Sequence, residues 1–183
     1  KLGAKIKKIH LFEPKYAISV YTILQRSEVS SNLGRYDGIR YGKNRNYFGE
    51  EAKRRIMLGT YTLSSGYYDA YYLKAQKVRT IICEDFKKAF ENVDLIIGPT
   101  SPSTALPLGV SKNDPMFGEV ADMLVEPSTV AGLPGVSLNC GFSEKNLPVG
   151  LQIIGPQFSE ELLFQAAYAY EQETDWHKRK PKL

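Results

Sequence analysis

The fold is decided by residues 136–154, which read VSLNCGFSEKNLPVGLQII. Two apolar runs, Val136 to Cys140 and Pro148 to Ile154, have the length of strands. Between them lies the polar turn 143–146, with the sequence Ser-Glu-Lys-Asn. Two short apolar runs joined by a polar turn predict a β-hairpin.

The segments on either side of this hairpin add a strand and a helix. Asp94 to Gly98 is a short, β-rich apolar run that Pro99 stops, so we expect a buried strand. The closing segment Glu160 to Glu173 predicts a helix. It places four apolar or aromatic residues on one face: Leu163, Ala166, Ala167 and Tyr170. Strands and helices together predict an α/β fold.

Helical patterns dominate the first half of the chain. Helices are expected over Tyr16 to Leu33, Glu50 to Ser64 and Tyr68 to Glu91, and the break Ser64-Ser65-Gly66 separates the last two. The third helix is predicted to carry one continuous buried stripe. Its members recur three or four residues apart: Tyr68, Tyr71, Tyr72, Ala75, Val78, Ile82, Phe86 and Phe90.

Four further segments complete the prediction. Lys5 to Leu11 is expected to be a short, partly exposed strand, and Gly34 to Asn46 a loop. Thr100 to Pro115 is rich in Pro, Ser and Thr, and loops of that length often line a site. A helix is predicted over Phe117 to Ala131. We find no repeat and no interdomain linker, so residues 1–183 are expected to belong to one domain.

Composition narrows the class of protein. The chain has 183 residues, of which 43% are hydrophobic, enough for a sizeable core. Its two cysteines, Cys83 and Cys140, lie far apart, which argues against a disulfide framework or a zinc site and favours a cytoplasmic protein. The longest apolar runs are far shorter than the ~20 residues of a membrane span, so no membrane association is expected.

The net charge of +4 comes from interleaved positive and negative residues and does not by itself call for nucleic acid. The basic tail Lys178 to Lys182 is the exception. It fits an ordinary solvated terminus or a contact with phosphate, and both interpretations stay open.

A self-contained catalytic centre is not evident. The two histidines, His10 and His177, sit near the chain ends, and no motif of a serine hydrolase, zinc protease or nucleotide-binding loop occurs. Ser64-Ser65-Gly66 fits a helix break better than a reactive serine pair. Cys140 ends an expected buried strand without a basic neighbour, so we assign it to packing.

Three long strings carry a resemblance to a known family. They are SEVSSNLGRYDGIRYG at 27–42, FGEEAKRRIMLGTY at 48–61 and SSGYYDAYY at 64–72. The match continues through GPTSP at 98–102, AGLPG at 131–135 and LPVGLQIIG at 147–155. The later strings resemble amidase-signature proteins in general. The earlier ones resemble the A subunits of the tRNA-dependent glutamyl amidotransferases within that family.

This resemblance implies a fold and a place within it. The amidase-signature fold is an α/β fold with a mixed central sheet covered by helices, and residues 1–183 would form the C-terminal portion of its single domain. The segment 43–47 is shorter than in the family. The family's nucleophile loop and catalytic lysine belong upstream of Lys1, so no catalytic residue is assigned to this chain. The fragment alone is therefore expected to be inactive.

The resemblance also implies a reaction, in which a Ser-Ser-Lys centre hydrolyses glutamine and releases ammonia. The implied partners of the chain are the amidotransferase subunits B and C in a heterotrimer, glutamine, and tRNA. The first of these two subunits receives the ammonia and contacts the tRNA. It uses ATP and Mg²⁺ to convert Glu-tRNA(Gln) into Gln-tRNA(Gln) for translation. The enzyme would be a cytoplasmic ligase, and this chain itself would bind no cofactor and no metal.

The residues that resemblance assigns to this chain bind substrate. Arg55 would hold the α-carboxylate of glutamine and Asp122 its α-ammonium, with Tyr21 close by. Without the motifs, Arg55 and Asp122 would both be interpreted as solvated helix residues. Two alternatives stay open. The chain is the C-terminal part of a general amidase-signature hydrolase, or it is a noncatalytic scaffold fragment.

Overall fold

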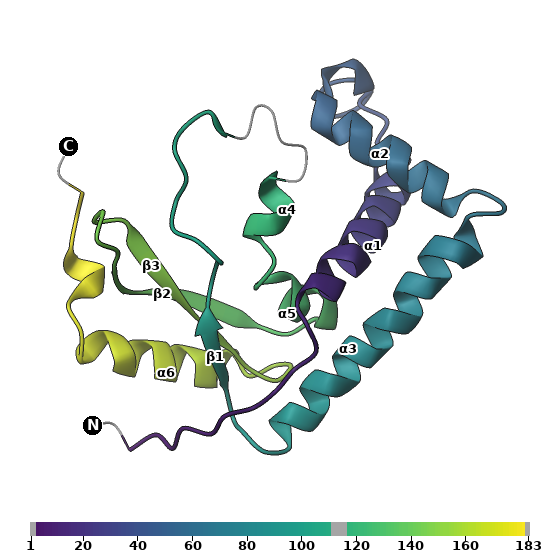
Figure 1. Ribbon diagram of the computed structural model, residues 1–183. Coiled ribbons are helices and arrows are strands. Elements are labelled where there is room, and N and C mark those ends of the chain that lie inside the picture. The colour runs from purple at the N-terminus through teal and green to yellow at the C-terminus, as the bar shows by residue number, and fades with distance from the viewer. Residues whose placement is uncertain (1–2, 111–116, 182–183) are drawn as a thin grey trace. The chain divides into compact units, whose positions relative to one another are not determined.

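The computed structural model describes residues 3–110 and 117–181 (Figure 1). The chain divides into two compact units. One runs to Ile18 and resumes at Ile82, and the other spans Ser19–Ile81. The first contains the β-sheet and the second is helical, so the predicted α/β class is confirmed.

The sheet of the first unit has three strands in the order β1-β3-β2. They are β1 (Ile96–Pro99), β2 (Gly135–Phe142) and β3 (Pro148–Ile154), and both described pairings are antiparallel. The predicted hairpin is thus confirmed. Its turn closes where the amide of Asn146 donates to the carbonyl of Ser143 at 2.8 Å. Asn146 has a φ of 59°, a conformation that asparagine tolerates better than most residues.

A β-bulge interrupts the hairpin at Cys140. The register shifts between Asn139 and Gly141, which leaves Cys140 as the extra residue on β2. Its thiol donates to the carbonyl of Val149 on β3 at 3.4 Å. The sulfur therefore contributes a contact within the hairpin, in keeping with the packing role expected for it.

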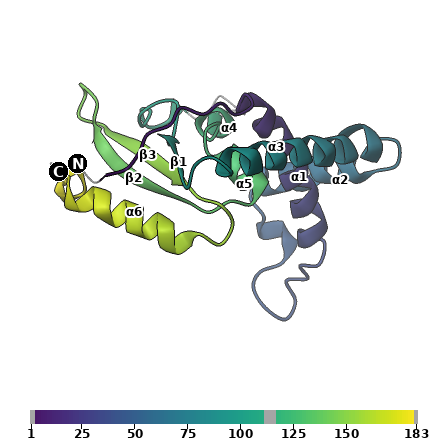
Figure 2. The same cartoon turned by 90° about the horizontal axis from the view of Figure 1, so that it is seen from below.

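Helix α6 (Glu160–Gln172) covers the sheet, and Figure 2 shows it lying along β2 and β3. Leu163 and Ala167 are buried one turn apart on its inner face. Ile153 and Ile154 are buried on the sheet side. The predicted closing helix is confirmed to within one residue of its end, because its apolar face has a sheet to cover.

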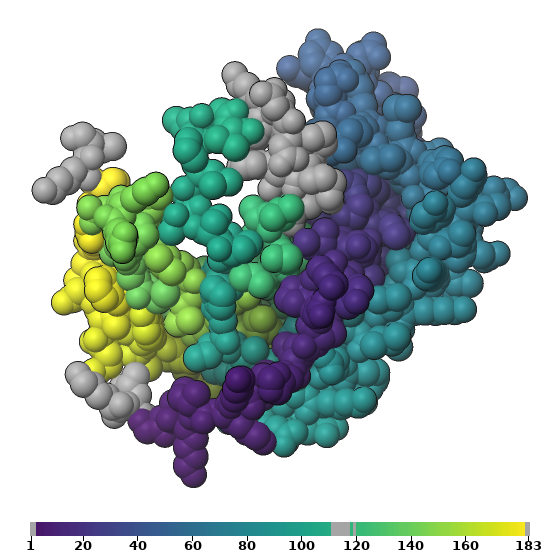
Figure 3. All heavy atoms as spheres, viewed as in Figure 1, coloured from purple at the N-terminus to yellow at the C-terminus, as the bar shows by residue number. Residues whose placement is uncertain are grey.

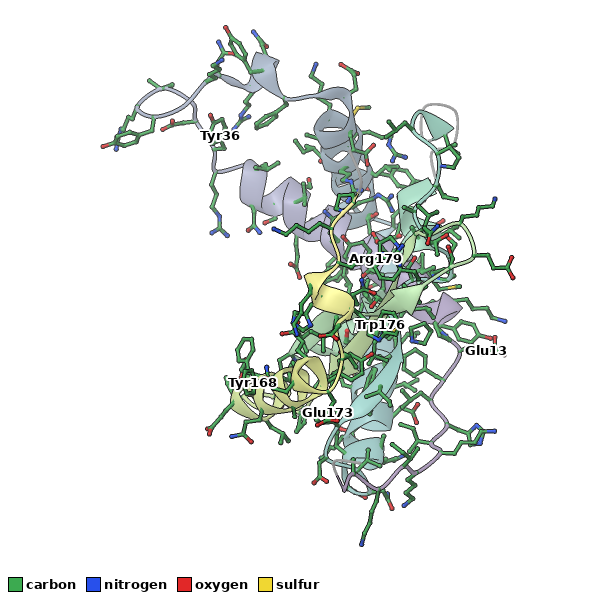
Figure 4. The ribbon with its side chains drawn as sticks, turned by 90° about the vertical axis from the view of Figure 1, so that its left-hand side faces the viewer. Glu13, Tyr36, Tyr168, Glu173, Trp176 and Arg179 are labelled. Carbon is green, nitrogen blue, oxygen red and sulfur yellow. The ribbon has the colours of Figure 1, made fainter. Side chains whose placement is uncertain are left out.

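The C-terminal segment is attached to the hairpin (Figure 3). It forms the 3₁₀ turn η4 (Trp176–Lys178), and the ring of Trp176 lies 6.2 Å from that of Phe142. The guanidinium of Arg179 stands 4.0 Å above Phe142 and donates to Asn146 at 2.9 Å (Figure 4). At least this part of the basic tail therefore has partners within the protein.

The second unit is built from helices and one loop. Its elements are α1 (Lys15–Leu33), η1 (Arg45–Tyr47), α2 (Glu50–Leu63), the π-helical turn η2 (Tyr68–Leu73) and α3 (Lys74–Phe90), of which α1 and α3 continue into the first unit. These agree closely with the predicted helices. Tyr36 stands at the stem of the loop after α1 and donates to the carbonyl of Lys43 (Figure 4).

Helices α1 and α2 meet backbone to backbone at Gly59. A Cβ at that position would collide with the carbonyl oxygen of Arg26. Beside this crossing, the hydroxyls of Ser30 and Thr60 share a hydrogen bond of 2.7 Å. The absence of a side chain at residue 59 therefore sets how closely the two helices approach.

The predicted buried stripe on the third helix is only half correct. Ala75, Ile82 and Phe86 are buried, but Tyr68 and Tyr71 are 43% and 44% exposed. The two tyrosines lie in η2, where the chain follows a π-helical turn. Such a turn adds a residue to the helical repeat, so the residues before it leave the face that the later ones bury.

The expected strand over Lys5 to Leu11 is wrong, since none of these residues pairs with a described strand. The segment gives no apolar face for a sheet to bury, because lysines flank an Ile6 that is 82% exposed. It is held instead at its end. The amide of Phe12 donates to Asp85 at 2.8 Å, and its ring meets that of Phe86 edge-on.

The helix predicted over Phe117 to Ala131 is split into α4 (Phe117–Ala121) and α5 (Glu126–Ala131). Pro127 stands in the first turn of α5, where proline is tolerated. It could not occupy the interior of one long helix, because it lacks an N–H and its ring would strike the preceding turn. The predicted site-lining loop is described only as far as residue 110, and its remainder lies outside the described residues.

We predict that Gly59→Ala lowers the free energy of unfolding of the full-length protein by about 1–3 kcal/mol, because the new methyl group forces α1 and α2 apart. The measurement is the shift in urea midpoint. Gly118→Ala is the matched control, since Gly118 is also helical but has open space at its Cβ position. Equal stability of Gly59→Ala and the natural protein would contradict the close approach.

Candidate functional site

Two of the three predicted site residues lie together in the second unit. Tyr21 on α1 and Arg55 on α2 are hydrogen-bonded through their side chains. Arg55 also donates from Nε to Oε1 of Glu51 at 2.6 Å. The bond to Glu51 raises the pKa of Arg55; partial burial opposes this, and Tyr21 adds a smaller rise. Arg55 is therefore a fixed cation held from two helices.

Glu51 joins two arginines. Besides Arg55, it binds Arg54 through two hydrogen bonds of 2.9 Å, one to each carboxylate oxygen. Arg54, and then Arg55, hold the pKa of Glu51 down at about 2. The carboxylate is thus ionised at any pH near neutrality, and the trio carries one net positive charge.

The sequence places this trio on one side of α2. Glu51, Arg54 and Arg55 are spaced i, i+3 and i+4, so the three side chains are neighbours on the helix surface. Glu51 also lies in the first helical turn, where the partial positive charge of the helix favours a carboxylate. Sequence reasoning singled out Arg55 and missed Glu51, although this spacing was a readable signal.

The third predicted residue, Asp122, lies in the first unit, in the turn between α4 and α5. Its backbone carbonyl accepts hydrogen bonds from the amides of Val125 and Glu126 at 2.9 and 3.0 Å, and the residue is exposed. Arg55 and Asp122 belong to different units, so their joint action on one ligand stays a prediction.

Two hydrogen bonds hold the turn that carries Asp122. The hydroxyl of Ser101 donates to the carbonyl of Ala121 at 3.1 Å. On the other side, Gln152 donates from Nε2 to the carbonyl of Leu124 at 2.8 Å. Ser101 and Gln152 come from two of the quoted motifs, 98–102 and 147–155. These motif residues fix backbone that lies within two residues of Asp122.

Gln152 has a second partner that ties the turn to the sheet. The same Nε2 donates to the carbonyl of Pro99 at the end of β1, at 3.1 Å. Gln152 is 9% exposed, so both carbonyls would lose their partner in a largely dry environment if the amide were removed. Neither Ser101 nor Gln152 was predicted as a site residue, because only the fold shows what they reach.

Other kinds of site find no support in the described part of the chain. Within residues 3–110 and 117–181, no three His, Cys, Asp or Glu side chains gather as a metal site would require. None of the described helices has the length and apolar character needed to cross a bilayer. A hollow of about 440 Å³ in the second unit is lined partly by Leu33, Phe48 and Met57, but by neither Tyr21 nor Arg55.

These observations define the class of protein: an α/β domain whose motifs hold charged residues in place and whose described residues show no catalytic serine-histidine pair. The sequence profile of the family described as Amidase matches residues 1–164. The chain belongs to this family.

Curated relatives narrow the likeness. The chain is 51% identical, over its whole length, to the A subunit of the glutamyl-tRNA(Gln) amidotransferase from Gloeothece citriformis, and 52% identical to that from Streptococcus agalactiae. It covers 41% and 40% of those proteins. The chain thus spans about two fifths of the length of the curated relatives it matches.

Solved structures agree with the family. The A subunit of the glutamyl-tRNA(Gln) amidotransferase from Thermotoga maritima is 40% identical with a TM-score of 0.66, over 88% of this chain and 33% of that one. A 6-aminohexanoate cyclic dimer hydrolase is 20% identical with a TM-score of 0.74, over 99% of this chain and 40% of that one. The second likeness shows the fold alone.

We predict that Gln152→Met lowers the free energy of unfolding of the full-length protein by about 1–3 kcal/mol, because two carbonyls lose their donor at unchanged side-chain volume. Denaturant unfolding measures the change. Gln165→Met is the control, since Gln165 is exposed on α6 and its amide donates to Glu161 on the same helix. If both variants unfold at the same midpoint, Gln152 does not hold the turn.

Proposed function

We propose that this chain is part of the glutaminase subunit of a tRNA-dependent amidotransferase. In this function the protein hydrolyses glutamine and supplies ammonia for the conversion of Glu-tRNA(Gln) into Gln-tRNA(Gln). The observation that carries the proposal is the identity of 51–52% along the whole chain to proteins named as the A subunit of the glutamyl-tRNA(Gln) amidotransferase.

The contribution of this chain is recognition of glutamine. Free glutamine has an α-carboxylate and an α-ammonium, and a pocket that selects it needs a fixed cation and a fixed anion. Arg55 is the cation in this proposal. It has more N–H donors than Glu51 and Tyr21 use, so donors remain for the ligand carboxylate. Asp122 is the anion, on a turn that Ser101 and Gln152 hold in place.

The chemical steps are assigned to other parts of the protein and its complex. A Ser-Ser-Lys centre outside this chain attacks the side-chain amide, forms an acyl-enzyme and releases ammonia. The amide-transferring subunit of the heterotrimer uses that ammonia with ATP and Mg²⁺ and brings the tRNA to the complex. ATP binding, the three-subunit assembly and the cytoplasmic location belong to this proposal.

We predict that Arg55→Ala and Asp122→Ala, in the full-length protein within its complex, each lower kcat/KM for glutamine roughly tenfold to hundredfold. Losing one charge-assisted hydrogen bond to substrate costs about 1.5–3 kcal/mol, and most of the loss should appear in KM. The assay is ammonia release from glutamine. Arg40→Ala and Asp94→Ala, both at exposed positions, are the matched controls.

Ammonia should bypass the same two variants. With ammonium chloride as nitrogen donor, Gln-tRNA(Gln) formation is expected at the rate of the natural complex, because the amide-transfer site is untouched. Simple aliphatic amides serve as a second substrate, since a general amidase would hydrolyse them with no need for Arg55. Normal use of glutamine by both variants, or failure of ammonia to rescue them, would show that the assignment is wrong.

The 183-residue chain alone is predicted to release no ammonia from glutamine, because positioning residues without a nucleophile cannot form an acyl-enzyme. The purified chain is incubated with glutamine and ammonia is measured. Activity that a substitution within residues 1–183 abolishes would place the nucleophile in this chain and contradict the proposal.

A further inference from the structure

The Glu51 carboxylate occupies one edge of the Arg55 guanidinium. The Nε of Arg55 donates to Glu51 Oε1 at 2.6 Å, the shortest hydrogen bond in the trio. Guanidinium is planar, so a partner fixed at Nε fixes the direction in which its remaining N–H groups point. The contact therefore determines orientation as well as charge.

Glu51 is itself prevented from moving with Arg55. Arg54 binds both oxygens of the carboxylate, each at 2.9 Å, in the paired geometry that aligns a carboxylate with a guanidinium. Tyr21 reaches Arg55 from α1. Arg55 is thus constrained from its own helix and from a neighbouring helix, and its side chain is 29% exposed, less than the 40% of Arg54.

The charge balance of the trio suits an anionic ligand. An isolated Glu51 would repel a carboxylate arriving at Arg55. Arg54 offsets that charge, so the trio keeps one net positive charge while Arg55 keeps its anchor. An arginine ordered before the ligand arrives loses less conformational freedom on binding, which strengthens binding.

We infer that Glu51 is a positioning residue for substrate recognition, which holds Arg55 so that its outer N–H groups meet the α-carboxylate of glutamine. The inference rests on the proposed function and extends it to a residue that does not touch the substrate. Glu51 thereby contributes to selectivity for amides that carry an α-carboxylate.

The test compares Glu51→Gln with Glu50→Gln in the full-length protein within its complex. Both glutamates lie in the first turn of α2, and Glu50 pairs with Lys53 at 3.2 Å instead of with an arginine of the trio. The two substitutions remove the same charge from the same helix end, so the loss of helix-dipole stabilisation is matched. Only Glu51→Gln removes the anionic anchor of Arg55.

For Glu51→Gln we expect KM for glutamine to rise about fivefold to tenfold with kcat within about twofold, and Glu50→Gln to behave like the natural protein. A second substrate, 4-aminobutanamide, is glutamine without its α-carboxylate. Its kcat/KM should not change in Glu51→Gln, so the preference for glutamine over it falls by the same factor. Both KM and this ratio are independent of the fraction of protein that is folded.

The outcomes separate this inference from the function on which it rests. If Arg55→Ala raises KM for glutamine and Glu51→Gln does not, the positioning role is overturned and the proposed function stands. The same conclusion follows if Glu51→Gln weakens both substrates equally, since that indicates a general structural role. If Arg55→Ala also leaves KM unchanged, glutamine recognition by this arginine is overturned, and the role of Glu51 with it.

Discussion

The backbone contact between α1 and α2 at Gly59 is the constraint on which the helical unit depends. Any side chain there would strike the carbonyl of Arg26, so residue 59 sets the spacing of the two helices. One turn before Gly59, the same face of α2 carries Arg55, which reaches Tyr21 on α1. A packing requirement of the glycine thus becomes a geometric requirement of the charged site, although Gly59 contacts no ligand in our account.

A neutral side chain has the comparable role in the sheet unit. The buried amide of Gln152 joins the end of β1 to the turn that carries Asp122, and Ser101 holds that turn from the other side. The proposed ligand charges are therefore held by different means. Arg55 is oriented by a charged neighbour, whereas Asp122 sits on a turn whose backbone is fixed by neutral donors. Loss of a neutral donor is expected to act through stability, and loss of Glu51 through binding.

The sequence predicted the elements that have their own apolar face or turn, including the hairpin, α1, α2 and α6. It failed where a neighbour decides the outcome. The π-helical turn exposes Tyr68 and Tyr71, and Pro127 splits the helix predicted over residues 117–131. For the site, the motifs predicted Tyr21 and Arg55, which the structure brings together. Gln152 and Ser101 were missed because their partners lie 20 or more residues away.

The central claim is that Arg55 and Asp122 grip the two ends of one glutamine molecule. The most direct measurement is a crystal structure of the full-length protein with glutamine bound. Our account predicts the α-carboxylate about 3 Å from the terminal nitrogens of Arg55, with Glu51 still on Nε, and the α-ammonium at a similar distance from the carboxylate of Asp122. Glutamine bound with its α-carboxylate on another cation, and Arg55 contacting only Glu51 and Tyr21, would contradict it.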